Sequence, residues 1–147
     1  MHLFSNLSEN ILLLWRGEHK CAPTDQIGTW QWAVLRDTDV WKEHGRAVDI
    51  SGAYLPGSFD VRPRDIAKKL NTDYKTREFQ VYMFGLAPAL LLDILPLEYW
   101  QNFCKLVRGI QILCQYHISH EDVRAAHMLL AEWGTKFKDL YYQQRAD

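Results

Sequence analysis

Residues 118–141, ISHEDVRAAHMLLAEWGTKFKDLY, carry the strongest fold signal in the chain. Ser119 stands where a helix N-cap is expected, and Asp122 occupies the capping-box position three residues later, although Asp fits it less well than Glu or Gln. Apolar residues then recur at steps of three and four, and they are Val123, Ala126, Leu130, Trp133, Phe137 and Leu140. This spacing predicts a long helix with a narrow apolar stripe that packs on a partner helix.

The preceding stretches predict such partners. Pro96 fits the first turn of a helix, and apolar residues follow it with the same helical spacing as far as Cys114. Residues 76–95 contain the run VYMFGLAPALLL, which predicts a helix buried on most of its circumference and kinked by Pro88. Short links between these helices predict an antiparallel helical bundle for residues 76–144.

The first third of the chain is less regular. Residues 5–16 predict a helix that ends at Gly17, and residues 38–50 predict a second helix. Between them, residues 18–28 are polar and predict a loop. Residues 30–35 fit either a strand or a helical turn.

A break rich in Gly, Pro and Ser interrupts the chain at residues 52–63. We therefore expect an N-terminal helical and loop segment at residues 1–60 and a helical bundle domain at residues 61–147. The expected fold class is mainly α, an antiparallel helical bundle with an irregular N-terminal part.

Composition limits the classes of function. The 147 residues are 13% aromatic and carry a net charge of −1, so the chain is expected to fold and is no polycation for nucleic acid or membrane. Its longest uncharged stretch, residues 79–92, falls short of the about 20 residues that span a bilayer. The start has no signal-peptide pattern, and three widely spaced cysteines favour reduced thiols. We expect an intracellular protein without a membrane partner.

One candidate metal site combines Cys114, His117 and His120, with His127 one heptad further along. Zinc requires about four nitrogen or sulfur ligands that converge tetrahedrally, and these residues straddle a helix end, a turn and a helix start. The alternative is a core cysteine with polar histidines in a turn. We favour the alternative because scattered histidines are common, and we expect no metal and no cofactor.

A basic segment, residues 62–77, is the candidate phosphate-contacting surface. Its cations are Arg62, Arg64, Lys68, Lys69, Lys75 and Arg77. Such a cluster can bind the phosphates of DNA. The commoner fate of a charge run is a solvated surface, and both interpretations stay open here.

The carboxylates show no pattern typical of catalysis. A nuclease that uses Mg²⁺ needs two or three acids brought together around the metal, whereas Glu98, Glu121, Asp122 and Glu132 stand at predicted helix starts or exposed positions. Periodicity and spacing alone therefore predict a helical domain without an evident active site.

Five stretches in order nevertheless resemble one family. They are MHLFSNLSENILLLWRGE at the start, VWKEHGRAVDISGAYLPGSF, RPRDI, YKTREFQVYMFGLAPALLLDILPLEYWQNFCKLVRGIQIL and ISHEDVRAAHMLLAEWGTKFKDLYY. Together they are similar to the central to C-terminal part of transposases of the CACTA / Kyakuja–Dileera–Zisupton group of DNA transposons, which are abundant in fungal genomes. The resemblance covers nearly the whole chain.

The resemblance implies a parent enzyme with an RNase H-like core, whose metal-binding acids cut and join DNA, and a helical insertion that interrupts this core. One catalytic Asp of the family precedes an M-H-L segment. The chain begins at Met1-His2-Leu3, so this Asp is missing, and His2 matches the family's His. The other two acids would lie further upstream and beyond Asp147. All three are expected to be absent.

One departure concerns the family's K-x-x-E-W-R stretch. Here Phe79 replaces the Trp and Gln80 replaces the Arg. Phe keeps an apolar contact, but a phosphate contact through the cation at that position does not carry over.

The sequence thus predicts a truncated, transposase-derived helical domain without catalytic activity of its own, whose parent performs metal-dependent DNA cleavage and strand transfer in the nucleus. The alternative is a domesticated helical module that binds protein or DNA, and a third candidate is a small zinc-dependent helical protein. The expected partners are the rest of a transposase core or a second copy, bound through the apolar N-terminal segment. DNA is a weaker candidate partner.

Overall fold

A computed structural model describes residues 2–142, with side chains from Phe4 onward. The predicted mainly α class is confirmed, and the described residues contain no strand. The chain divides into two compact units, Met1–Leu95 and Pro96–Asp147.

The first unit begins with helix α1, His2–Trp15, which ends as predicted. Gly17 has a φ of 66°, a left-handed conformation that glycine adopts at no steric cost. The Gly17 amide donates to the Leu14 carbonyl at 3.0 Å, and the Glu18 amide donates to the Leu13 carbonyl at 2.8 Å. These two hydrogen bonds form a Schellman motif, which satisfies the last carbonyls of the helix.

The inner face of α1 is covered within its own unit. Ile11, Leu12 and Trp15 are buried, and α1 packs against α4. The rings of Phe4 and Phe84 form a T-shaped pair with a centroid distance of 5.4 Å. The sequence predicts that this apolar segment binds the rest of a transposase core or a second copy, whereas here the chain itself covers its inner face. The physical reason is that the apolar run at residues 79–92 supplies the missing surface.

Residues 16–37 form the irregular part. Two short 3-10 turns, Ile27–Thr29 and Val34–Arg36, are its regular elements. The ambiguous stretch at residues 30–35 is therefore partly helical turn, and buried Trp32 and Leu35 anchor it.

Helix α2, Thr38–Gly52, is capped by Asp37, whose side chain accepts hydrogen bonds from the amides of Asp39 and Val40. Its buried side chains include Trp41, His44 and Val48, which lie three and four residues apart on one face.

Residues 76–95 do not form one continuous helix. Helix α4, Thr76–Val81, runs into a π-helical segment, Tyr82–Leu86, and then into α5, Ala87–Leu90. The irregularity expected at Pro88 therefore lies just before it, where the Ala87 amide donates to the Tyr82 carbonyl five residues back. Proline removes one helical hydrogen bond and crowds the preceding turn, and a π turn is one way to accommodate both effects.

The boundary between the two units lies at residue 95, not at the predicted residue 60. Short helix α3, Ile66–Lys69, follows the glycine- and proline-rich stretch and packs against α2. An ion pair of 2.7 Å also joins Asp60 to Arg77. These contacts tie both sides of the stretch into one unit.

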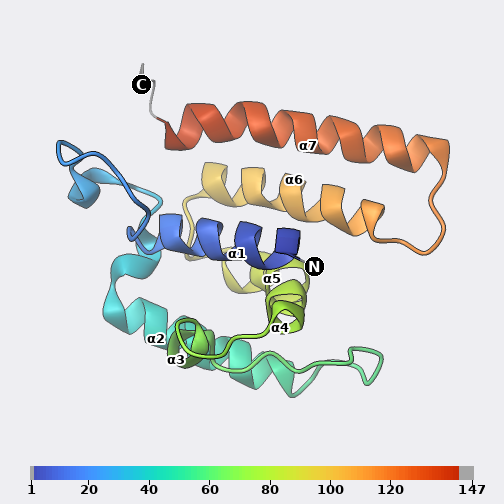
Figure 1. Cartoon of the computed structure of the whole chain (residues 1–147), viewed down its shortest axis with the longest axis horizontal. Helices are drawn as coiled ribbons and strands as arrows, with labels where there is room; N and C mark the ends of the chain where they lie inside the picture. The colour runs from blue at the N-terminus through green and yellow to red at the C-terminus, as the bar shows by residue number, and fades with distance from the viewer. Residues whose placement is uncertain (1, 143–147) are drawn as a thin grey trace. The chain divides into compact units, whose positions relative to one another are not determined.

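The second unit is a pair of antiparallel helices, α6, Leu97–Leu113, and α7, His120–Tyr141, which lie side by side (Figure 1). The predicted capping box is present, since the Asp122 amide donates to Ser119 Oγ at 3.1 Å and the Ser119 amide donates to Asp122 Oδ2 at 3.0 Å. Gly109 permits a close approach of the helices, because a Cβ there would lie 2.8 Å from Leu130 Cγ. No helix in residues 2–142 is long and apolar enough to cross a membrane.

Candidate functional site

The basic segment is held by two helix starts in the first unit. Asp65 caps α3 and accepts hydrogen bonds from the amides of Ala67 and Lys68 at 3.0 and 3.3 Å. Glu78, in the first turn of α4, accepts a hydrogen bond from the Lys75 amide at 3.0 Å. Helix N-termini favour such carboxylates, because their first amides lack partners within the helix.

Glu78 is the most strongly bound residue of this region. Its side chain is 3% exposed and accepts Arg64 Nε at 2.8 Å and Arg64 Nη2 at 2.6 Å, one on each oxygen. The Arg64 amide adds a third hydrogen bond at 3.1 Å. Burial disfavours the charged carboxylate, but the hydrogen bonds from Arg64 and from the two backbone amides outweigh it and lower the pKa of Glu78.

The other cations of the basic segment are mostly paired at the surface. Lys68 contacts Asp65 at 2.9 Å, Arg77 contacts Asp60 at 2.7 Å, and Lys75 is paired with Asp73. Exposed pairs of this kind contribute little to stability, so a competing phosphate can open them.

Two cations of the segment, Arg62 and Lys69, form no ion pair within the described residues. Arg62 instead donates to the Asp49 carbonyl at 3.1 Å. Residues 60–78 contain six basic and four acidic side chains, a net charge of +2. This arrangement can attract a phosphate chain weakly. Arg64 contributes little to that attraction, because both prongs of its guanidinium are bound to Glu78.

The candidate zinc ligands are all exposed. Cys114 follows the end of α6, His117 lies in the turn, and His120 and His127 belong to α7. Within residues 2–142, no group of three His, Cys, Asp or Glu side chains is placed to hold a metal ion. The side chain of His117 meets the ring of Tyr116 edge-on at 4.8 Å.

His2 opens helix α1, but its side chain lies outside the described part of the chain.

One buried histidine, His44, is not among the site residues predicted from the sequence. His44 is 2% exposed, and its Nε2 lies 2.8 Å from the Tyr82 hydroxyl in a hydrogen bond, while its Nδ1 has no partner. Burial lowers the pKa of His44 to about 4, so the ring is neutral at pH 7. The helical spacing of α2 placed His44 on the inner face, but no local pattern pointed to Tyr82 as its partner.

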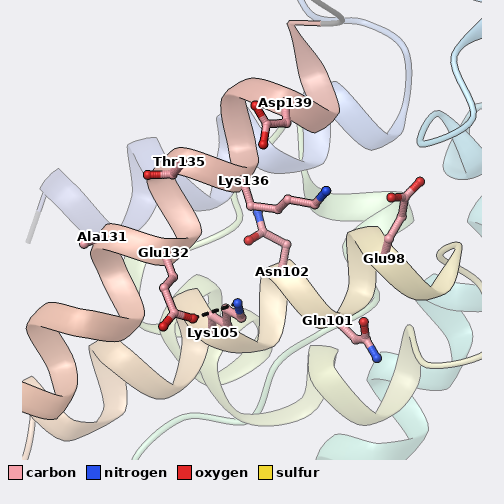
Figure 2. Close-up of a pocket in the computed structure, with 9 residues that line it drawn as sticks. All are labelled: Glu98, Gln101, Asn102, Lys105, Ala131, Glu132, Thr135, Lys136 and Asp139. Carbon is pink, nitrogen blue, oxygen red and sulfur yellow. Dashed lines mark hydrogen bonds and ion pairs between the residues drawn. The ribbon is translucent and has the colours of Figure 1, made fainter.

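A groove of about 530 Å³, lined mostly by polar and charged residues, lies between α6 and α7 (Figure 2). Lys105 and Glu132 form an ion pair of 2.8 Å within it, as Figure 2 shows. Asn102 is buried at its base and donates to the Trp133 carbonyl at 3.3 Å, and its Oδ1 is unpartnered. The remaining lining residues are Glu98, Gln101, Ala131, Thr135, Lys136 and Asp139. Their mixed charges select no single class of ligand.

Comparison with known proteins adds no relative: no protein-family model, no curated protein and no solved structure matches the chain.

Proposed function

We propose that this chain is a transposase-derived helical domain of a DNA transposon of the CACTA / Kyakuja–Dileera–Zisupton type, and that it does not cut DNA by itself. The parent activity would be metal-dependent DNA cleavage and strand transfer by a core to which this domain belongs. The nucleus is the compartment in which that chemistry takes place.

The resemblance of the five stretches carries this proposal, and the Arg64–Glu78 ion pair joins two of them. Arg64 belongs to the RPRDI stretch and Glu78 to the YKTREF stretch, two of the five stretches on which the resemblance rests. The buried carboxylate of Glu78 receives both prongs of the Arg64 guanidinium. The two stretches thus meet in one structural contact, as expected if they belong to one domain and position its helices.

The placement of the acids supports the second half of the proposal. Two-metal DNA cleavage needs carboxylates that hold the ions in line with a phosphate. In residues 2–142 no such group converges, and the buried carboxylate, Glu78, is already saturated by an arginine and two amides.

The genomic neighbourhood tests the origin. We expect the flanking DNA to encode the three metal-binding acids in the same frame or to carry inverted repeats. An intact, isolated gene without either feature would favour the alternative, a domesticated helical module that binds protein or DNA.

A nicking assay tests the absence of activity. Purified chain incubated with supercoiled DNA and Mg²⁺ or Mn²⁺ should leave the DNA intact. Metal-dependent nicking that disappears when one internal carboxylate is replaced would contradict the proposal.

A further inference from the structure

A second groove, in the first unit, is apolar. It has a volume of about 390 Å³ and lies between α2 and the segment that includes α5 and the turn after it. Val40 and Ala47 line it from α2, and Leu90 and Ile94 line it from the other side. Val40 is 36% exposed, and the other three are partly exposed. We call this feature the α2 groove.

The α2 groove has an uncharged side chain beneath its aliphatic walls. His44 also lines it, and the ring is buried and neutral at pH 7. The groove therefore presents four aliphatic side chains over a base without charge, and covering these side chains is favourable because it removes apolar surface from water.

The charged residues of the α2 groove have one sign. Asp39 and Glu43 line it, and no Lys or Arg does. Glu43 forms an exposed ion pair with Arg46 at 2.7 Å, whereas Asp39 forms no ion pair within residues 2–142. The occupant that complements this rim is positively charged, because opposite charges across an interface steer association and disfavour anionic competitors.

The length of the α2 groove matches a helical occupant. Val40 and Ala47 are seven residues apart on α2, which corresponds to about two turns, or roughly 10 Å. An amphipathic helix that inserts apolar residues at i, i+3 or i+4, and i+7 spans the same distance. We propose that the α2 groove binds a short, cationic, amphipathic helix of a partner protein. This proposal does not depend on a transposase origin.

Fluorescence anisotropy of a labelled peptide tests the proposal on the full chain. The probe is a helical peptide of about 15 residues built from leucine and lysine, and its counterpart replaces lysine with glutamate. The lysine peptide should bind at least tenfold more tightly than the glutamate peptide. Methyl signals of Val40, Leu90 and Ile94 should shift in NMR spectra during the titration.

Two substitutions of the same kind locate the contact. Val40→Lys places a charge in the groove, and Ile50→Lys places the same charge on an exposed position of the same helix, where Ile50 is 54% exposed. Val40→Lys should lower the affinity for the lysine peptide at least tenfold. Ile50→Lys should keep that affinity within twofold of the parent chain's. A third variant, Asp39→Lys, keeps the aliphatic walls and should reverse the preference between the two peptides.

Three results would overturn the proposal. Equal binding by the Val40→Lys and Ile50→Lys variants, with circular dichroism showing both folded, would place the peptide elsewhere. Equal affinity for the two peptides would remove the cationic requirement. Groove methyl shifts that depend on protein concentration without peptide would identify the occupant as a second copy of the chain.

Discussion

Arg64 holds Glu78 through two parallel hydrogen bonds of 2.8 and 2.6 Å, although the two residues lie fourteen positions apart in the sequence. The pair connects the start of the α3 region to the first turn of α4. A bidentate arginine–carboxylate contact fixes direction as well as distance, so it sets how α4 leaves the preceding loop. The two amides that also bind Glu78 leave its carboxylate fully satisfied.

Replacing Glu78 with Gln should destabilise the first unit by roughly 2–3 kcal/mol. Breaking a buried ion pair costs about 3–5 kcal/mol, and the partial exposure of Arg64 to water reduces that cost. Urea unfolding of the variant and the parent chain, with an unchanged m-value, measures the difference. Arg64→Lys should also destabilise, since lysine cannot form the two-pronged contact.

Glu43→Gln is the matched control for this prediction. Glu43 also pairs with an arginine, at 2.7 Å, but both partners are mostly exposed. Exposed pairs contribute little, so this variant should unfold at the parent's urea concentration. Equal losses in the two variants would show that the burial of Glu78 has no energetic consequence.

Gly109→Ala should destabilise the α6–α7 pair by about 1–3 kcal/mol, despite the better helix propensity of alanine. The new Cβ would lie 2.8 Å from two side-chain carbons of Leu130, so either that side chain or one of the helices must shift. Gly134→Ala in α7 is the control, because no atom lies within 4 Å of its new Cβ. That variant should gain up to about 1 kcal/mol. If Leu130→Ala does not rescue Gly109→Ala, the clash is not the cause.

His44 should make the protein less stable as the pH falls from 7 to about 5. Burial lowers its pKa from 6.5 to about 4, so in this window the unfolded chain binds a proton that the folded chain does not. The contribution is complete above pH 6.5 and is lost as the pH falls toward the folded pKa, about 2 kcal/mol of it by pH 5.

Thermal or urea unfolding at several pH values checks this dependence. His44→Phe should flatten it, even though the variant loses the hydrogen bond to Tyr82 and is less stable at pH 7. His127→Gln, at an exposed position, should keep the parent's slope. A slope that survives His44→Phe would assign the effect to another titrating group.

Local signals made the helices predictable. The Ser119 capping box, the Gly17 stop and the helical spacing of Trp41, His44 and Val48 each depend on residues a few positions apart, and the structure contains all three. The unit boundary could not be predicted in the same way. The glycine- and proline-rich stretch marks a break in the helices. Long-range pairs such as Arg77–Asp60 decide whether the residues on its two sides belong to one unit or to two.

The candidate sites show the same division. The six cations of the basic segment could be read from the sequence. The carboxylates that pair with them lie up to seventeen residues away, so the pairing could not be predicted. The α2 groove combines residues from two elements about fifty positions apart, which no periodicity connects. Val40, a large apolar residue of α2, lines this groove and is 36% exposed.

DNA binding by the basic segment should be weak and only moderately dependent on salt. Arg62 and Lys69 are its two cations without an ion pair in the described structure, and each phosphate contact contributes about −0.9 to the slope of log K against log salt concentration. We therefore expect a slope of about −2 for a short duplex, measured by anisotropy across a salt series. Replacing both residues with Gln should abolish the binding.

The control for this experiment replaces Lys20 and Lys42 with Gln, since both are exposed lysines of the same unit outside the segment. It changes the net charge by the same amount and should leave the slope near −2. Equal loss in both double variants would place the DNA elsewhere on the surface. A slope of about −4 or steeper would show that Lys68, Lys75 and Arg77 release their carboxylates to bind phosphate, because surface ion pairs are weak enough to exchange.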